Sequence, residues 1–183
     1  MFTFGYPARF TADEDGRLVV RFPDFPEAVT DGKDFAEAMA EAADCLGSVI
    51  AIRMSRKEEI PPPSPAKRGQ RLVSVPLWIA PKLALYSATR QQRITNSELA
   101  RRLGCRETVV RRMLDPSHAT RPERIETALE LVGKCLVIAV EDAAQASPHR
   151  GSHRTEVTVS GPAQPRRQSS APLRPGTTSS IRR

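Results

Sequence analysis

The stretch TNSELARRLGCRETVVRRMLD, residues 95–115, predicts two short helices separated by a tight turn. Thr95 can cap the first helix, and Glu98 three residues later completes the pattern of a capping box. Leu99 and Leu103 lie one turn apart and give this helix a buried stripe. Gly104 supplies the backbone freedom that a sharp turn between two helices needs. We therefore expect this stretch to fold as a pair of helices packed against each other.

The second helix of this pair is expected to have two very different faces. Its inward residues are apolar, and those expected on its outward side are mostly arginines. The inward face comprises Val109, Val110, Met113 and Leu114, and the outward face comprises Arg106, Glu107, Thr108, Arg111 and Arg112. An ordinary helical hairpin with a solvated arginine-rich face is the alternative interpretation.

The spacing of Ala100, Gly104 and Val110 resembles the packing signature of the phage-repressor (Cro/C1-like) helix-turn-helix. Arg106 departs from that pattern, in which Ser or Thr usually caps the second helix. The resemblance implies that the second helix enters the major groove of double-stranded operator DNA. The candidate DNA-binding residues are Ser97, Arg101, Arg106, Glu107, Thr108, Arg111 and Arg112.

The net charge of +7 is unevenly distributed along the 183 residues. Residues 1–66 carry 7 basic and 12 acidic side chains, a net charge of −5, whereas residues 90–124 carry 9 basic and 4 acidic side chains, a net charge of +5. Residues 145–183 carry 7 basic side chains and 1 acidic side chain, a net charge of +6. Such asymmetry indicates different partners for different parts of the chain.

The three cysteines, Cys45, Cys105 and Cys135, are far apart and contain no C-x-x-C pair. A disulfide framework or a zinc site is therefore not expected, and a reducing cytoplasm fits this composition. No signal peptide is evident, and the longest apolar run, residues 135–140, is too short to span a membrane. We expect a cytoplasmic protein with no cofactor, no bound metal and no membrane association.

The first half of the chain predicts a small antiparallel sheet with one helix. Residues 6–11 and 17–22 alternate around an Asp/Gly turn, which indicates a β-hairpin. The segment Pro23–Pro26 is expected to interrupt the sheet before a short strand at 28–30, because proline cannot donate to a β-ladder. From Asp34, a helical N-cap, to about Met54 the apolar period becomes helical.

The remaining elements predict a mostly helical second part. Residues 56–70 are proline-rich and read as a loop, and residues 71–77 as a fourth strand with Leu72, Ser74 and Pro76 near an edge. Helices are expected at 82–92 and, after a capping box from Thr120 to Glu123, up to Gly133. A terminal strand at 135–140 is expected to pair within the chain or, by weak preference, with a second copy. Residues 145–183 contain few large apolar side chains and are expected to be disordered.

The chain also resembles the HicB antitoxin family over roughly residues 3–141. The motifs that carry the resemblance are Tyr6-Pro-Ala with Asp13-Glu-Asp-Gly16, FPDFPEAVTDG at 22–32, Phe35-Ala-Glu-Ala, Ile60-Pro-Pro-Pro-Ser64 and Arg112–Thr120. The resemblance implies a degraded ribonuclease-H-like domain that binds and blocks a small basic ribonuclease toxin, HicA. It also implies a DNA-binding domain that represses the operon encoding both proteins.

Together these features predict an α+β protein in three parts. These are a toxin-binding domain at 1–75, a helix-turn-helix domain with a terminal strand at 76–144, and a basic tail at 145–183. The acidic first domain suits a partner that itself binds RNA, since complementary charge favours association. Because helix-turn-helix repressors usually act as dimers, we expect a homodimer or a higher even-numbered oligomer.

The candidate toxin contacts are Asp24, Phe25 and Glu27, in a proline-held loop that combines an aromatic ring with carboxylates. The alternative is that Phe25 is a core residue and the acids only solubilise the chain. The carboxylates Asp13, Glu14, Asp15, Asp24, Asp31 and Asp34 could suggest a metal-dependent nuclease. Most of them lie in Gly- or Pro-containing turns, where Asp is favoured for local hydrogen bonding, so a non-enzymatic antitoxin is preferred. A stand-alone repressor with a ligand- or protein-sensing N-terminal domain is the other alternative.

Overall fold

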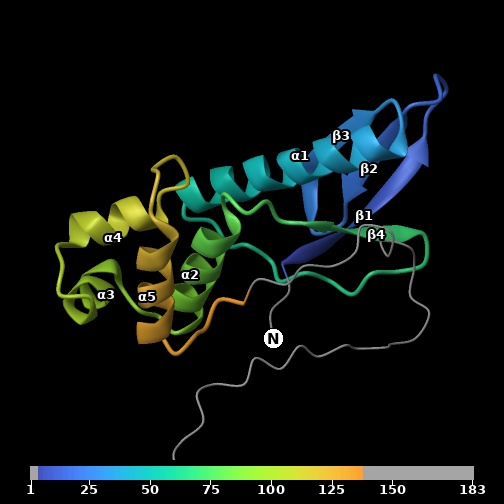
Figure 1. Cartoon of the computed structure of the whole chain (residues 1–183). Coiled ribbons are helices and arrows are strands. Elements are labelled where there is room, and N and C mark those ends of the chain that lie inside the picture. Colours follow the sequence, from blue (N-terminus) through green and yellow to red (C-terminus); the bar gives the residue numbers. More distant parts are fainter. Residues whose placement is uncertain (1–3, 138–183) are drawn as a thin grey trace, which may run out of the picture. The chain divides into compact units, whose positions relative to one another are not determined.

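The computed structural model describes residues 4–137, which form a small sheet with one long helix, followed by four shorter helices (Figure 1). This arrangement confirms the predicted α+β class, whereas the ribonuclease-H-like relationship stays a prediction. In chain order the elements are β1 (Gly5–Ala12), β2 (Leu18–Phe22), β3 (Phe25–Gly32), α1 (Phe35–Ser55), β4 (Gln70–Ser74), α2 (Ala80–Gln91), α3 (Asn96–Arg102), α4 (Glu107–Leu114) and α5 (Pro122–Leu131).

The sheet has four antiparallel strands in the order β3-β2-β1-β4. β1 and β2 form the predicted hairpin, in which Phe10 pairs with Val20. Asp13 holds its turn, because its Oδ1 accepts hydrogen bonds from the backbone N–H groups of Asp15 at 3.1 Å and Arg17 at 2.8 Å. Local hydrogen bonding of this kind is the reason that Asp is favoured in turns.

The third strand begins earlier than the sequence suggests. β3 starts at Phe25, which pairs with Phe22, so the ladder resumes at once after a tight turn at Pro23 and Asp24. The expected interruption up to Pro26 is therefore wrong. β3 is an edge strand with a register shift opposite Arg21 and Phe22, and such positions tolerate a residue that lacks a backbone donor.

α1 lies across one face of the sheet (Figure 1). Asp34 caps it as predicted, accepting a hydrogen bond from the backbone N–H of Glu37 at 2.9 Å. Its predicted apolar stripe faces the strands, with Ala42, Leu46 and Ile50 fully buried. The helix approaches β3 so closely that a Cβ at Gly32 would lie 2.3 Å from the backbone nitrogen of Ala38. Glycine at this position is therefore required by close packing.

The buried apolar side chains form two clusters. The sheet core joins β1–β4 with α1 and the start of α2, and the helical core joins α2–α5. α2 belongs to both, since Leu83 and Tyr86 lie in the sheet core while Leu85 and Ala88 lie in the helical core. Half-buried Leu114 also packs against both clusters. The predicted boundary at residue 75 stays a prediction.

The proline-rich segment after α1 is a loop up to Gly69, as predicted, and its start is tied to neighbouring elements. The Tyr6 hydroxyl donates to the carbonyl of Pro61 at 2.8 Å, and burial raises the pKa of Tyr6 to about 12. β4 then pairs with β1 and turns Val73 into the core, while Leu72 is 59% exposed. The fourth strand is therefore confirmed, although it ends at Ser74 and not at Leu77, and its buried side is the one that carries Val73.

Two predictions about the end of the described chain need correction. α5 begins at Pro122 as expected for a first-turn proline, but no side-chain hydrogen bond caps it. The Thr120 hydroxyl instead donates to the carbonyl of His118 at 3.5 Å, so the predicted capping box is wrong. Residues 135–137 are not in a strand, and the rest of the predicted strand and the basic tail lie outside the described residues.

In the part of the chain that the structure describes, no helix is both long and apolar enough to cross a membrane.

Candidate functional site

The α3–α4 pair is the first candidate site, and its turn follows the chemistry expected from the sequence. The Thr95 side chain accepts a hydrogen bond from the backbone N–H of Glu98 at 3.2 Å and so caps α3. Gly104 adopts a φ of +62°, in the left-handed region that favours glycine, so the backbone conformation and not a close contact accounts for glycine here. Leu99, Ala100 and Val110 are buried where the two helices pack.

Glu98 has a different role from the one expected. Its carboxylate accepts hydrogen bonds from Arg101 at 2.8 and 2.9 Å and from Arg102 at 2.8 Å, so these arginines, and not the Thr95 amide, are its partners in residues 4–137. The two guanidinium groups hold the pKa of Glu98 at about 2. The second half of the capping box is therefore replaced by a charge network on the outer side of α3.

α4 has the two faces that its sequence predicts. Val110 and Met113 are buried, and Val109 and Leu114 are half-buried. The outward residues are all exposed: Arg106, Glu107, Thr108, Arg111 and Arg112. No side-chain hydrogen bond caps α4, as the presence of Arg106 at the cap position implies. The free N–H groups at this end of α4 are therefore left without a capping side chain.

Glu107 links two other candidate residues, Ser97 and Arg111. Its carboxylate accepts a hydrogen bond from the Ser97 hydroxyl at 2.8 Å and one from the Arg111 guanidinium at 3.3 Å. Both contacts lower the pKa of Glu107, the Ser97 bond most strongly. The side chains of Arg106 and Arg112, in contrast, have no ion-pair partner among residues 4–137. α4 therefore presents cationic groups that its own fold does not neutralise.

A hollow beside α4 is lined in part by two arginines, Arg121 and Arg124, that were not among the predicted DNA-binding residues. It is lined by Val109, Arg112, Met113, His118, Ala119, Thr120, Arg121 and Arg124. Arg121 and Arg124 come from the start of α5 and are exposed. The sequence could have indicated this pair, because two arginines three residues apart near a predicted helix start lie on one side of that helix.

The candidate toxin contacts differ in their accessibility. Phe25 is 0% exposed, with the Tyr6 ring edge-on at a centroid separation of 4.9 Å and the Arg53 guanidinium carbon 4.9 Å from its centroid. The alternative of a core residue therefore describes Phe25. Glu27 accepts a hydrogen bond from Arg53 at 2.7 Å, and this lowers the pKa of Glu27. Its carboxylate still lies at the surface, where a partner can reach it.

Asp24 holds the proline-rich loop against the turn between β2 and β3. Its Oδ2 accepts a hydrogen bond from the backbone N–H of Ser64 at 3.0 Å. The two segments form a shallow depression lined by Pro23, Asp24, Ser64, Pro65, Ala66, Lys67 and Gln70. Asp24 therefore has a structural task, and its half-buried side chain also borders a concave surface.

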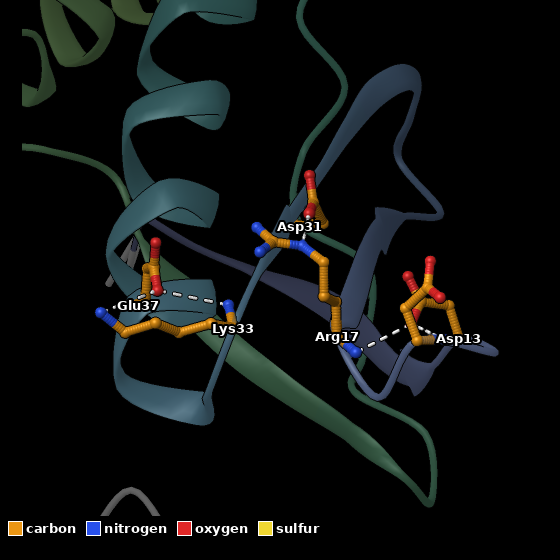
Figure 2. A network of polar contacts seen from close by, with 6 residues as sticks. Asp13, Arg17, Asp31, Lys33 and Glu37 are labelled. Atoms are coloured by element: carbon orange, nitrogen blue, oxygen red, sulfur yellow. Dashed lines mark hydrogen bonds and ion pairs between the residues drawn. The ribbon is translucent and has the colours of Figure 1, made fainter.

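Several other acidic side chains, those of Asp13, Asp31, Asp34 and Glu37, are used in a turn, a helix cap and surface ion pairs. Figure 2 shows Asp31 beside the guanidinium of Arg17, Asp13 at the backbone N–H of Arg17, and Glu37 beside Lys33. Asp34 caps α1. Among residues 4–137, no group of three or more His, Cys, Asp or Glu side chains is arranged to hold a metal ion. The observed contacts thus give these carboxylates local structural roles.

Comparison with known proteins connects this chain to one family. A sequence model described as the HicB-like antitoxin of a bacterial toxin–antitoxin system matches residues 5–84. Antitoxin HicB 2 of Photorhabdus laumondii subsp. laumondii is 41% identical over 131 residues, which cover 72% of this chain and 92% of that protein. Antitoxin HicB of Escherichia coli K12 is 36% identical over 135 residues, which cover 74% and 98% respectively. Alignments of 131 and 135 residues within a chain of 183 necessarily include α3 and α4.

Proposed function

This chain belongs to the HicB-like antitoxin family, and we propose that it binds and neutralises a small HicA-like ribonuclease toxin and represses its own operon through α3 and α4. The observation that carries the first half is the identity of 41% with an antitoxin across 92% of that protein. The second half rests on the exposed cationic side of α4. The protein acts by binding and is not itself an enzyme.

The acidic character of residues 1–66 supports a basic toxin as the partner. Their net charge of −5 provides a surface that attracts an RNA-binding protein and speeds the encounter with it. A toxin whose cationic surface is covered in this way loses access to the phosphate backbone of its substrate. We assign the contact to the region of Asp24 and Glu27, with Phe25 supporting it from beneath as a core residue.

Co-expression with a HicA-like toxin tests the antitoxin half. We expect the full chain to restore growth and to co-purify with that toxin. Glu27→Gln should weaken the complex more at low salt than at high salt, because exposed charges are screened. Glu41→Gln, on the outer side of α1, is the matched control for the loss of one exposed carboxylate.

Two results would contradict this half of the proposal. Failure of rescue and of co-purification, in a protein that still binds its operator, would favour a stand-alone repressor. Magnesium-dependent nuclease activity that disappears with Asp24→Asn would show that the protein is an enzyme, since such chemistry requires carboxylates at the metal.

The exposed side of α4 supports helix-turn-helix binding to operator DNA. Arg106, Arg111 and Arg112 can reach base edges or phosphates, with Thr108 beside them, while Ser97 and Arg101 lie on the neighbouring helix. In the free protein Glu107 accepts hydrogen bonds from Ser97 and Arg111. These bonds must break wherever Ser97 or Arg111 binds DNA instead. Arginine reads guanine or neutralises phosphate, and the geometry here permits both roles.

Binding to the promoter region of the operon, measured at several salt concentrations, tests the DNA half. The logarithm of the association constant should fall with the logarithm of salt concentration by roughly 0.9 for each phosphate neutralised. We expect a two-fold related operator bound by a homodimer or a higher even-numbered oligomer. An affinity that is equal for promoter and random DNA would contradict a repressor role.

A further inference from the structure

The side chain of Lys82 is buried, which is unusual for a lysine. Lys82 lies in the first turn of α2, immediately before Leu83 of the sheet core, and is only 4% exposed. Lysines are almost never fully buried unless their ammonium group is paired. The partners of this ammonium therefore explain why the position carries a lysine.

Three backbone carbonyls receive the Lys82 ammonium. They belong to Asp115, Pro116 and His118, in the segment between α4 and α5, and the Pro116 contact is the longest at 3.4 Å. An ammonium has three donors, so this set can use all of them. The lysine thus joins α2 to the chain immediately after α4, more than thirty residues away in sequence.

The electrostatics of the two helices show which end this contact serves. The first turn of α2 is its positive end, an unfavourable place for a cation, and burial lowers the pKa of Lys82. Asp115 is the C-cap of α4, whose last carbonyls lack partners within the helix and favour a cation. The ammonium therefore opposes the dipole of its own helix and complements that of α4.

The segment after α4 is shaped to present these carbonyls. The Asp115 side chain accepts a hydrogen bond from the backbone N–H of Ser117 at 2.9 Å, and the Asp115 carbonyl accepts one from the N–H of His118 at 3.2 Å. One turn further along α2, the Tyr86 hydroxyl donates to the carbonyl of Glu58 at 2.6 Å and holds the helix in place. The bonds from Lys82 to the carbonyls of residues 115, 116 and 118, here called the clamp, thus connect a local turn to a helix that is anchored in the sheet core.

We propose that Lys82 is a positioning residue, which fixes the C-terminal end of α4, and hence its DNA-contacting side, against α2. This proposal rests on the DNA-binding half of the proposed function. A binding helix must be held within a fraction of an ångström of its productive geometry, and side chains locked by their own hydrogen bonds provide that support. Lys82 itself touches no DNA, since its ammonium is enclosed by carbonyls.

The test uses the full chain with Lys82→Met, which keeps much of the length of the side chain and removes its ammonium. Lys33→Met is the control, because it removes one exposed lysine charge before α1. If the variant holds α4 correctly in about one molecule in ten, operator affinity should fall about tenfold. Affinity for random DNA, which depends on charge alone, should fall much less, and toxin neutralisation should persist.

The ratio of operator to random-DNA affinity separates positioning from mere stability. Partial unfolding would lower both affinities in proportion, whereas a misplaced α4 lowers the ratio. Amide hydrogen exchange should also accelerate selectively in residues 115–120. An unchanged affinity ratio in a folded Lys82→Met protein would overturn the proposal.

If Lys82→Met does not fold, a measurement on the unmodified protein tests the proposal instead. The ammonium protons of Lys82 should exchange slowly with water, so that the nitrogen-15 resonance of this group is observed. The nitrogen should show scalar coupling, across the hydrogen bonds, to the carbonyl carbons of Asp115 and His118. The resonance should persist in the operator complex. Its absence from the free protein would overturn the clamp, and its loss on operator binding would overturn the positioning role. A native protein that shows the resonance but binds no operator would instead refute the DNA-binding proposal alone.

Discussion

The stretch Phe22–Gly32 and helix α4 both combine apolar with charged side chains, but the charges are acidic in the first and mostly basic in the second. In Phe22–Gly32 the acidic side chains bond to neighbours in the same fold: Asp24 to Ser64, Glu27 to Arg53, and Asp31 to Arg17. Its central ring, Phe25, is fully buried. On the outer side of α4, Arg112 has no ion-pair partner within residues 4–137.

This difference separates residues that hold the fold from residues that are free to bind a partner. A side chain already engaged in packing or in a local hydrogen bond is costly to remove, because the fold loses that interaction. An exposed cation without a partner contributes little to stability and much to the attraction of an anion. We therefore expect loss of the buried Phe25 ring to lower stability, and loss of the exposed α4 arginines to lower DNA binding alone.

The largest expected effect is loss of stability at Phe25. Phe25→Ala removes a fully buried ring from the sheet core and should lower the free energy of unfolding by about 3–5 kcal/mol. Urea denaturation of the full chain measures this. Leu72→Ala, at a side chain that is 59% exposed, is the control and should change the free energy by no more than about 0.5 kcal/mol. Equal losses would mean that Phe25 is not a core residue.

The next effect should concern binding alone. Arg111→Ala combined with Arg112→Ala should weaken operator binding by about 30-fold or more, since each specific arginine contact contributes about 1–3 kcal/mol. Unfolding free energy and toxin neutralisation should be nearly unchanged. A double variant, Lys33→Ala with Arg56→Ala, removes the same charge from exposed positions near the two ends of α1. If toxin neutralisation also fails in the arginine variant, the two activities are not separable by region.

The smallest effect is an acid dependence of stability at Glu98. The Arg101 and Arg102 contacts hold its pKa at about 2, below the ordinary value of 4.5. A lowered carboxyl pKa contributes stability that is complete above the ordinary value and is lost as pH falls towards 2. Glu98→Gln should therefore differ from the native chain at neutral pH and converge with it in acid. The comparison is made by thermal unfolding, and a constant difference across that range would contradict the charge network.

Local sequence patterns predicted most of the elements correctly. The helical period from Asp34 onward, the alternation around Asp13–Gly16, and the Thr95 and Gly104 signals all act over a few residues of chain. The predicted faces of α4 followed for the same reason, since its periodicity separates Val110 and Met113 from the arginines. These features are determined locally, because a turn of helix or a tight turn is closed by nearby residues.

The errors arose where a residue had a choice of partners. Glu98 and Thr120 fit capping boxes by spacing, but nearby arginines engage Glu98 and the His118 carbonyl accepts from Thr120. Pro26 breaks strands in general, yet an irregular edge strand accommodates it. A sequence motif indicates which hydrogen bonds a side chain can form, and competition among neighbouring groups decides which of them does form.

By itself, the sequence determined the order of the elements, the charge of each region and the resemblance to a HicB antitoxin. Only the tertiary structure decided that Phe25 lies in the core, that Asp24 holds the loop at Ser64, and that Lys82 caps the far end of α4. Each of these features depends on segments distant in the chain; Asp24 and Ser64, for example, are 40 residues apart. Periodicity reports which face of an element is buried, but the partner on that face is chosen when the elements pack.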